Sequence, residues 1–330
     1  MPELGWAGGF TILTRDGRLV FDPDSTCLCG RNCSVFISHA HADHFIGLKS
    51  KPPKYSTQQT RRIFESIHGK PVENFFDIEF NKPVHVGDAE ITPINAGHML
   101  GSTQFLVALP DMTILYTGDI NYTDTLTTVK AERAECDVLV MEATYGEPSY
   151  IFPDRESIYN SIVTWTLSRI AQGILPSFKV YAAGKAQELI RLFNTFTNLD
   201  VTTDQRISRI SEVYSASGCR MRHRELSATR DGSPSVYLTA DSSTFNGEEY
   251  ARAVTTGWAL RMNAKGLAAF PLSSHADFSQ LLQFIRDCRA KTVYVFTGYM
   301  GVFADYVRRK LGIVSRPLPV LPQKTLCSFH

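Results

Sequence analysis

The amino-acid sequence predicts an α/β fold, and two observations carry that prediction. In residues 1–146, short apolar runs separated by turn residues follow one another at the spacing of β-strands. After residue 146, strand-like runs alternate with helical stretches, which is the pattern of the β–α units that build a parallel sheet. A chain of 330 residues is long enough for one large or two ordinary domains.

The first part of the chain reads as strands with one helix. Phe10–Leu13 and Leu19–Asp22 are apolar runs separated by a turn containing Asp16-Gly17, which predicts a hairpin. Ser34–Ile37 predicts a strand, and a helix is expected near Gln58–His68 after capping residues. Further strands are expected near residues 84–86, 91–94, 104–109, 113–116 and 136–141.

The second part alternates between helices and strands. Apolar residues at helical spacing predict a helix over residues 154–171. The remaining expectations are strands at 179–182, 236–239, 257–261 and 292–296, and helices at 184–193, 276–288 and 303–311.

Composition is that of an ordinary folded protein, with 43% hydrophobic and 20% charged residues. No apolar run reaches the roughly 18–20 residues that span a bilayer, and the N-terminus does not resemble a secretory signal. We therefore expect no membrane partner and a cytoplasmic protein, or a nuclear one in a eukaryote.

The charge balance does not by itself indicate a nucleic-acid-binding protein. The net charge is +1, whereas a dedicated binder often carries a strong excess of Lys and Arg. Two basic clusters are read as solvated faces or, alternatively, as phosphate-binding tracks: Lys49, Lys51, Lys54, Arg61 and Arg62, and Arg220, Arg222, His223 and Arg224.

The chain has seven cysteines, and Cys27, Cys29 and Cys33 lie close together. In a chain without an export signal, free thiols are the default expectation. A metal role, a redox role and an incidental loop all remain open for this group.

The segment Ser38–His44 concentrates three histidines and an aspartate directly after the expected strand at 34–37. In an extended chain, His39 and His41 point to the same side. Asp43 and His44 fall where the chain leaves the strand and can approach the same point from another direction. Because imidazole and carboxylate are the usual zinc ligands, the segment predicts a metal site; the alternative is a histidine-rich surface loop.

The pattern His-x-His-x-Asp-His resembles the metallo-β-lactamase fold family. His98, after the expected strand at 91–94, resembles the third motif of that family, and Asp119, after the expected strand at 113–116, resembles the fourth. The resemblance implies an αββα sandwich with two candidate metal sites. The implied ligands are His39, His41, His98 and Asp119 for a first zinc ion, and Asp43, His44 and Asp119 for a second.

Two later segments resemble motifs A and B of the β-CASP nuclease branch of this family. Glu142 precedes Thr144-Tyr145-Gly146, and His275 lies in Ser273-Ser274-His275-Ala276-Asp277. The resemblance implies a metallo-β-lactamase domain in two parts, residues 1–146 and 263–330, with an inserted α/β β-CASP domain at 147–262. Gly184–Gln187 and Thr256–Trp258 further resemble ligase-associated DNA exonucleases and archaeal exonucleases similar to messenger-RNA 3′-end processing factors.

Motif C departs from the pattern of the RNA-processing members. Thr297 stands where they carry a histidine, and the DNA-processing members typically carry valine there. Threonine resembles valine in shape and cannot replace an imidazole ligand. The departure favours DNA over RNA and implies a poorer second metal site, which Mg²⁺ or Mn²⁺ could occupy in place of Zn²⁺.

The resemblance implies roles for the remaining site residues. Asp43 would orient or deprotonate the attacking water, and His275 would bind the scissile phosphate or protonate the leaving oxygen. Glu142 would orient His275 through its other ring nitrogen. Lys185, at a helix start, and Ser274 are the expected substrate contacts.

The function expected from the sequence is therefore a zinc-dependent nuclease acting on DNA, namely an exonuclease of DNA repair or end processing. DNA ligase or other repair proteins are the implied partners. The first alternative is an RNA 3′-end-processing nuclease of the same family. A small-molecule hydrolase of the same fold and a non-catalytic scaffold subunit are further alternatives.

Overall fold

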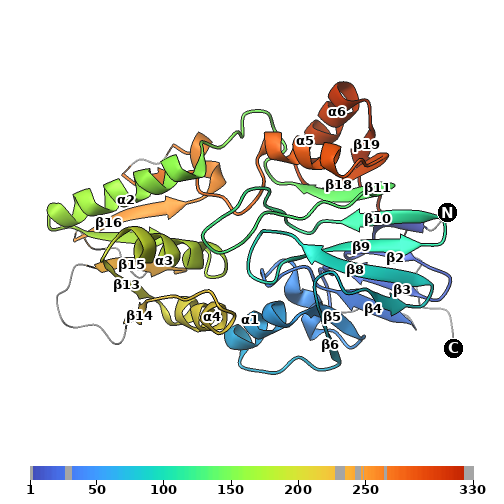
Figure 1. Cartoon of the computed structure of the whole chain (residues 1–330), viewed down its shortest axis with the longest axis horizontal. Helices are drawn as coiled ribbons and strands as arrows, with labels where there is room; N and C mark the ends of the chain where they lie inside the picture. The colour runs from blue at the N-terminus through green and yellow to red at the C-terminus, as the bar shows by residue number, and fades with distance from the viewer. Residues whose placement is uncertain are drawn as a thin grey trace. The chain divides into compact units, whose positions relative to one another are not determined.

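Three β-sheets organise the chain in the computed structural model (Figure 1). The chain forms two compact units: the first comprises Met1–Thr123, Lys130–Ser149 and His275–His330, and the second comprises Asp124–Val129 and Tyr150–Ser274. Residues 263–274, which we expected to lie in the closing part of the first domain, belong to the second unit. The structure describes residues 3–26, 32–226, 235–241, 247, 249–263 and 266–322.

The first unit begins with a six-stranded sheet in the order β1-β2-β3-β4-β5-β6. The predicted hairpin forms between β2 and β3, where Thr14 N–H donates to the Gly17 carbonyl at 2.9 Å. From β3 to β6 all pairs are parallel, so β4 delivers the chain to the carboxyl edge of the sheet. The strands are β1 (Glu3–Trp6), β2 (Phe10–Leu13), β3 (Arg18–Phe21), β4 (Cys33–Phe36), β5 (Lys54–Thr57) and β6 (Phe75–Ile78).

The second sheet of this unit has seven strands in the order β19-β18-β11-β10-β9-β8-β7. The β7–β10 part is antiparallel, and the β10–β11–β18–β19 part is parallel. The strands are β7 (Val84–Val86), β8 (Ala89–Asn95), β9 (Thr103–Leu109), β10 (Met112–Tyr116), β11 (Val138–Ala143), β18 (Thr292–Gly298) and β19 (Val314–Pro317).

The two sheets pack face to face around an aromatic core. Phe21 and Phe36 of the first sheet lie 5.4 and 5.5 Å, between ring centroids, from Phe105 of the second. All three rings are fully buried, and burying each contributes about 1.5–3 kcal/mol. This core fixes the relative positions of the two sheet edges that carry the candidate site.

Helices cover the outer face of each sheet. Phe64 of α1 (Gln58–His68) packs with Val35 of the first sheet. Leu281 of α5 (Phe278–Asp287) and Phe303 of α6 (Met300–Leu311) pack with the second. The layers run helix, sheet, sheet, helix, and this confirms the predicted αββα sandwich.

The second unit contains a six-stranded sheet in the order β14-β13-β15-β12-β16-β17, and every pair in it is parallel. Parallel sheets need helical crossovers that cover their faces; Trp165 of α2, for example, packs against Phe178 and Phe270. The elements are α2 (Arg155–Ala171), β12 (Leu175–Lys179), α3 (Lys185–Phe196), β13 (Asp200–Thr203), α4 (Gln205–Ala216), β14 (Arg224–Glu225), β15 (Ser235–Thr239), β16 (Tyr250–Thr255) and β17 (Ala268–Phe270).

Two local expectations in this unit were wrong. The strand expected at residues 179–182 ends at Lys179. The strand expected at residues 257–261 is a 3₁₀ helix, Gly257–Arg261, because the Thr256 hydroxyl accepts a hydrogen bond from Trp258 N–H and caps a helical turn there. The strand lies directly before it, as β16.

Candidate metal centre

The segment from Ser38 to His44 leaves β4 at the carboxyl edge of the first sheet and then enters a 3₁₀ helix, Phe45–Lys49. His41 O accepts the N–H groups of His44 and Phe45, which turns the chain back on itself. His39 becomes fully buried, whereas Asp43 stays largely exposed. The turn brings His39, His41 and His44 together from different directions.

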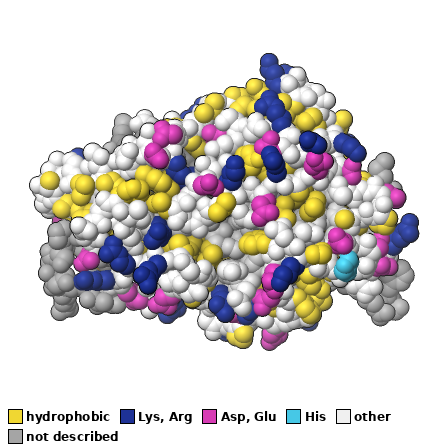
Figure 2. All heavy atoms as spheres, in the orientation of Figure 1, with side chains coloured by type: hydrophobic (Ala, Val, Ile, Leu, Met, Phe, Trp, Pro, Cys, Tyr) yellow, Lys and Arg dark blue, Asp and Glu magenta, His cyan; other side chains and the backbone are white. Residues whose placement is uncertain are grey.

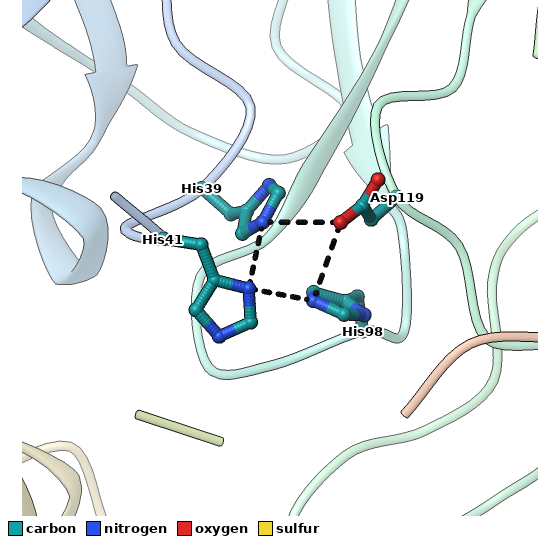
Figure 3. A group of neighbouring side chains, drawn as sticks. All are labelled: His39, His41, His98 and Asp119. Carbon is teal, nitrogen blue, oxygen red and sulfur yellow. Dashed lines mark hydrogen bonds and ion pairs between the residues drawn. The ribbon is translucent and has the colours of Figure 1, made fainter. Parts of the chain in front are cut away.

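Four ligand-type atoms converge next to this turn: His39 Nε2, His41 Nδ1, His98 Nε2 and Asp119 Oδ2. All lie within 4.8 Å of one another (Figure 3). His41 Nδ1 is 3.1 Å from both of the other imidazole nitrogens. Asp119 Oδ2 is 3.5 Å from His39 Nε2 and 3.7 Å from His98 Nε2.

Glycines deliver His98 and Asp119 to the cluster. Gly97 has φ +69°, and a Cβ there would lie 2.6 Å from Ala131 N and Asn121 O. Gly118 has φ +53°, and a Cβ there would lie 2.6 Å from Ser38 Cβ. Both positions require glycine because the backbone is left-handed and closely approached. The Gly-His and Gly-Asp pairs therefore have a structural cause.

The imidazole of His39 is held neutral. Burial lowers its pKa well below the ordinary value, and the neighbouring histidines, His44 first, lower it further. The Ser38 hydroxyl donates to Asp22 Oδ2 at 2.5 Å, so its oxygen is free to accept from His39 Nδ1 at 2.9 Å. In that tautomer, His39 Nε2 presents a lone pair to the centre of the cluster.

The donor set fits a divalent cation. A proton on His41 Nδ1 could satisfy only one of its two N···N contacts, which leaves lone pairs facing one another in a buried place. A positive ion removes that conflict, and three neutral imidazoles with one carboxylate are a typical zinc ligand set.

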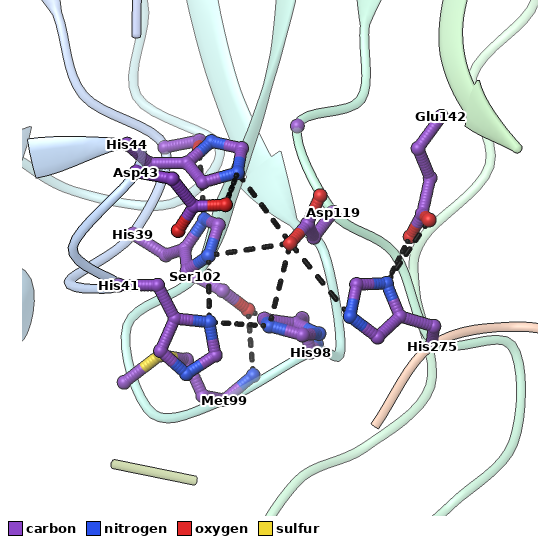
Figure 4. A network of polar contacts seen from close by, with 12 residues as sticks. His39, His41, Asp43, His44, His98, Met99, Ser102, Asp119, Glu142 and His275 are labelled. Atoms are coloured by element: carbon purple, nitrogen blue, oxygen red, sulfur yellow. Dashed lines mark hydrogen bonds and ion pairs between the residues drawn. The ribbon is translucent and has the colours of Figure 1, made fainter. Parts of the chain in front are cut away.

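Asp119 is the common neighbour of a second group of side chains (Figure 4). Its Oδ2 is 3.5 Å from His44 Nε2 and 3.8 Å from His275 Nε2, and His44 Nε2 is 3.7 Å from Asp43 Oδ2. Burial raises the pKa of Asp119 to about 6, against the lowering effect of His44. A carboxylate in this place can face cations on two sides.

Asp22 is a site residue that the sequence analysis missed. It is buried at the end of β3, and its carboxylate accepts hydrogen bonds from Ser38 N–H at 2.7 Å and Tyr116 O–H at 3.0 Å, besides the Ser38 hydroxyl. It also lies 2.9 Å from His44 Nδ1. The only local signal was an acid at the end of a buried strand, which is also typical of a turn.

His44 is held between carboxylates. Burial alone would lower its pKa, but Asp119, Asp22 and Asp43 outweigh burial and raise it to about 10. The hydrogen bond between Nδ1 and Asp22 leaves Nε2 directed at Asp43 and Asp119. Asp22 therefore orients two of the predicted ligands, His39 through Ser38 and His44 directly.

The structure brings Glu142 and His275 into contact. Glu142 is fully buried at the end of β11, and its carboxylate lies 2.9 and 3.0 Å from His275 Nδ1. It also accepts Ile120 N–H at 2.8 Å. Burial would raise the pKa of Glu142, but the charge and hydrogen bond of His275 lead the effects that lower it. An ionised Glu142 keeps the proton on His275 Nδ1.

Three other predicted positions lie as follows. Thr297 of β18 pairs in register with Glu142, next to a β-bulge. Lys185 is buried in the second unit, where its Nζ donates to the Leu272 carbonyl at 2.8 Å. Ser274 is half-buried at the end of the same unit. Substrate contacts of Lys185 and Ser274 stay predictions.

The cysteine group is only partly described. Cys27 and Cys29 lie outside the described residues, and Cys33 is a buried residue of β4 whose thiol pKa is raised by burial. Burial of the thiol makes Cys33 a poor nucleophile.

Two of the five residues of the first basic cluster are engaged with the protein itself, whereas Lys49, Lys51 and Arg62 are exposed. Lys54 is buried and donates to the Ser50 and Pro52 carbonyls at 2.6 and 3.0 Å, and Arg61 pairs with Asp77 at 2.9 Å. Basic and acidic side chains are mixed over the face drawn in Figure 2. Among the described residues, no helix is both long and apolar enough to cross a membrane.

Comparison with known families decides what this sandwich is. A family model described as a beta-lactamase superfamily domain matches residues 33–172, which include the histidine turn, His98, Asp119 and Glu142. This stretch is a metallo-β-lactamase domain. The relatives described next are consistent with the predicted resemblance to its β-CASP nuclease branch.

The curated relatives carry names from both DNA and RNA metabolism. A "Probable DNA ligase" of Opitutus terrae is 27% identical over 83% of this chain. An "RNase J-like protein" of Methanocaldococcus jannaschii is 33% identical over 36% of this chain. The matches span only 28% and 30% of the length of these relatives.

A solved structure supports the fold across most of the chain. A protein of unknown function from Enterococcus faecalis superposes with a TM-score of 0.63, covering 88% of this chain and 92% of its own. The two sequences are 14% identical, so the likeness concerns the fold alone.

Proposed function

We propose that this protein is a metal-dependent nuclease that hydrolyses phosphodiester bonds. The observation that carries the proposal is the buried convergence of His39, His41, His98 and Asp119 beside the Glu142–His275 pair. When bound, a divalent cation neutralises charge that builds on the phosphoryl oxygens and lowers the pKa of water. We propose zinc as the ion of the first site.

The chain's own acids and bases supply the proton transfers in this proposal. Asp43, whose side chain is 81% exposed, is free to accept a proton from the attacking water. His275 holds its Nδ1 proton against Glu142 and presents Nε2 for a second proton, which it gives to the leaving oxygen. Ionised Glu142 favours that doubly protonated state.

We propose His44 and Asp43, with Asp119, as the holders of a second cation. Thr297 pairs with Glu142 at the motif C position and offers no imidazole there. The second site is therefore proposed to be the weaker one, open to Mg²⁺ or Mn²⁺ as well as Zn²⁺.

DNA is the substrate that we propose. The relative named as a probable DNA ligase aligns over 83% of this chain, whereas the RNase J-like relative aligns over 36%. Thr297 supports the same choice. We propose exonucleolytic trimming of DNA ends, with a DNA ligase or other repair proteins as partners, working in the cytoplasm or in a eukaryotic nucleus.

RNA processing is the second candidate. The relative named RNase J-like has the higher identity, 33% against 27%. In both cases, we propose that the inserted β-CASP domain, expected at residues 147–262, corresponds to the second unit, which extends to Ser274.

One assay tests the function and the substrate together. End-labelled single-stranded DNA and RNA of one sequence are incubated with chelator-treated protein to which Zn²⁺, Mg²⁺ or Mn²⁺ is added back. Stepwise shortening of DNA is expected, with losses of at least about 100-fold for Asp43→Ala and His275→Ala. Asp111→Asn, at an exposed turn, is the matched control. Full activity in both site variants would contradict the proposal, and cleavage of RNA alone would replace DNA by RNA.

A further inference from the structure

A buried polar cluster lies in the second unit between α2 and α3. It consists of Arg155 and Tyr159 from α2 and of Lys185 and Glu188 from α3, and we call it the α2–α3 cluster. The side chain of Glu188 is 2% exposed and that of Arg155 is 15% exposed. Glu188 Oε1 accepts from Arg155 Nε at 2.8 Å and Nη2 at 2.6 Å, and also from the Tyr159 hydroxyl.

Arg155 and Lys185 also donate hydrogen bonds to backbone carbonyls. Arg155 Nη2 donates to the Ser273 carbonyl at 3.0 Å, and Lys185 Nζ donates to the Leu272 carbonyl at 2.8 Å. These are consecutive carbonyls of one segment, and that segment continues through Ser274 into His275. All of these contacts lie within the second unit.

The arrangement is costly for a purely structural feature. It buries a guanidinium and an amine beside one carboxylate, and burial lowers the pKa of Lys185 to about 7 in spite of Glu188. Apolar side chains of similar volume are often neutral or stabilising in place of buried charges. Apolar side chains, however, cannot donate the hydrogen bonds that hold two adjacent carbonyls in place.

The C-terminal end of the same segment, His275–Asp277, is fixed in the first unit. His275 contacts Glu142, Ala276 N–H donates to the Ile120 carbonyl at 2.8 Å, and Asp277 caps α5. The segment Leu272–Asp277 is therefore held on both sides of the imidazole. If the N-terminal end, Leu272 and Ser273, were not held, His275 would sample positions away from the reacting phosphate.

We propose that Arg155 and Lys185 are positioning residues, which fix His275 by holding the carbonyls of Leu272 and Ser273. This inference rests on the proposed nuclease function. Glu188 and Tyr159 act indirectly, because they fix the guanidinium of Arg155.

A double-mutant cycle tests the inference. Arg155→Met is made alone and in a His275→Ala background, and kcat and KM are measured on the end-labelled oligonucleotide. Alone, Arg155→Met should lower kcat about 10–100-fold, as a small misplacement of a catalytic group does, and leave KM within about twofold. In the His275→Ala background it should cost less than about twofold more, because the residue through which it acts is gone. Lys185→Met should lower kcat to a similar extent and, in the His275→Ala background, should also cost less than about twofold more.

Two controls separate positioning from loss of stability. Ile210→Ala removes a buried side chain of α4 in the same unit and should lower Tm while kcat stays within about twofold. Arg155→Lys keeps a cationic donor and should recover part of the kcat lost in Arg155→Met. Hydrogen–deuterium exchange of peptide 272–277 should accelerate in Arg155→Met and not in Ile210→Ala.

The outcomes are distinguishable. An equal loss of kcat with and without His275, or an equal loss in Ile210→Ala, would overturn the positioning role. If the wild-type protein cleaves neither DNA nor RNA, the proposed function fails. Exchange of peptide 272–277 then still decides whether Arg155 holds the segment, and unchanged exchange would overturn that as well.

Discussion

At the scale of single residues, Asp119 is the carboxylate that lies next to both groups of site residues. Its Oδ2 lies within 4.0 Å of nitrogens from four histidines: His39, His44, His98 and His275. One carboxylate therefore faces both the first donor set and the predicted second set. Neutralising it removes a negative charge from both at once.

Asp119→Asn should weaken cation binding strongly. The amide keeps the shape of the side chain but loses the charge, so zinc affinity should fall by at least about 100-fold. Calorimetric titration of chelator-treated protein with Zn²⁺ measures this directly. Asp111→Asn serves as the control, and equal zinc affinity in the two variants would contradict the ligand assignment.

Asp22→Asn should weaken both folding and cation binding although Asp22 does not face the cluster. It would disturb the hydrogen bonds from Ser38, Tyr116 and His44, and bonds to a charged group contribute about 1.5–3 kcal/mol each. Zinc affinity should fall about 10–100-fold. Tyr116→Phe removes one of these bonds and should cost about 1.5–3 kcal/mol with little effect on affinity. Similar affinity in Asp22→Asn and wild type would rule out the orienting role.

These residues were predictable to the extent that they matched a known motif. His39, His41 and His44 fall within one short run, and His98 and Asp119 match later motifs of the family that this run resembles. Asp22 also follows an apolar strand but matched no such motif. It is a lone acid whose partners, Ser38 and Tyr116, come from β4 and β10, and only the folded sandwich brings them together.

At the scale of elements, glycine-containing loops at the ends of strands set the site geometry. The loop after β8 turns at Gly97 and delivers His98, and the loop after β10 turns at Gly118 and delivers Asp119. Strand and helix positions in the first unit were readable because apolar runs were bounded by such turns. The run at 257–261 misled the prediction, because its capping contact from Thr256 is invisible in an apolar pattern.

Gly97→Ala should be far more damaging than an equivalent change elsewhere. The added Cβ would meet backbone atoms at 2.6 Å, so the loop must move and His98 with it. Gly69, at the end of α1, has a similar φ of +66° and nothing within 4 Å of an added Cβ, which makes Gly69→Ala the matched control. We expect about 1 kcal/mol for the control and at least twice that for Gly97→Ala, measured by urea unfolding. Equal costs would show that crowding at Gly97 is unimportant.

At the scale of the whole molecule, stability should respond to pH through a buried lysine of the second unit. The pKa of Lys185 is about 7 in the folded chain and near 10.5 when unfolded, because burial outweighs the attraction of Glu188. Between these values the unfolded chain binds more protons, so the free energy of unfolding should rise with pH across this window. Below pH 7 the full cost of burying the charge remains.

Lys185→Met should remove this dependence. The difference in unfolding free energy between wild type and variant should shift in favour of the wild type as pH rises from 7 to 10. Lys179→Met, at an exposed position of β12, should give a difference that does not change with pH. Parallel wild-type and Lys185→Met curves would contradict the buried-charge account.

The position of β18 in the second sheet affects how the chain is made. β18 lies between β11 and β19, yet the ribosome produces it only after the whole of Tyr150–Ser274. At a synthesis rate of about 5–20 residues per second, the edge of β11 that pairs with β18 waits roughly 7–30 s for its neighbour. An unpaired edge of this kind invites association with other nascent chains. The unit that begins first is completed last, and a chaperone that covers β11 during this interval should raise the yield of folded protein.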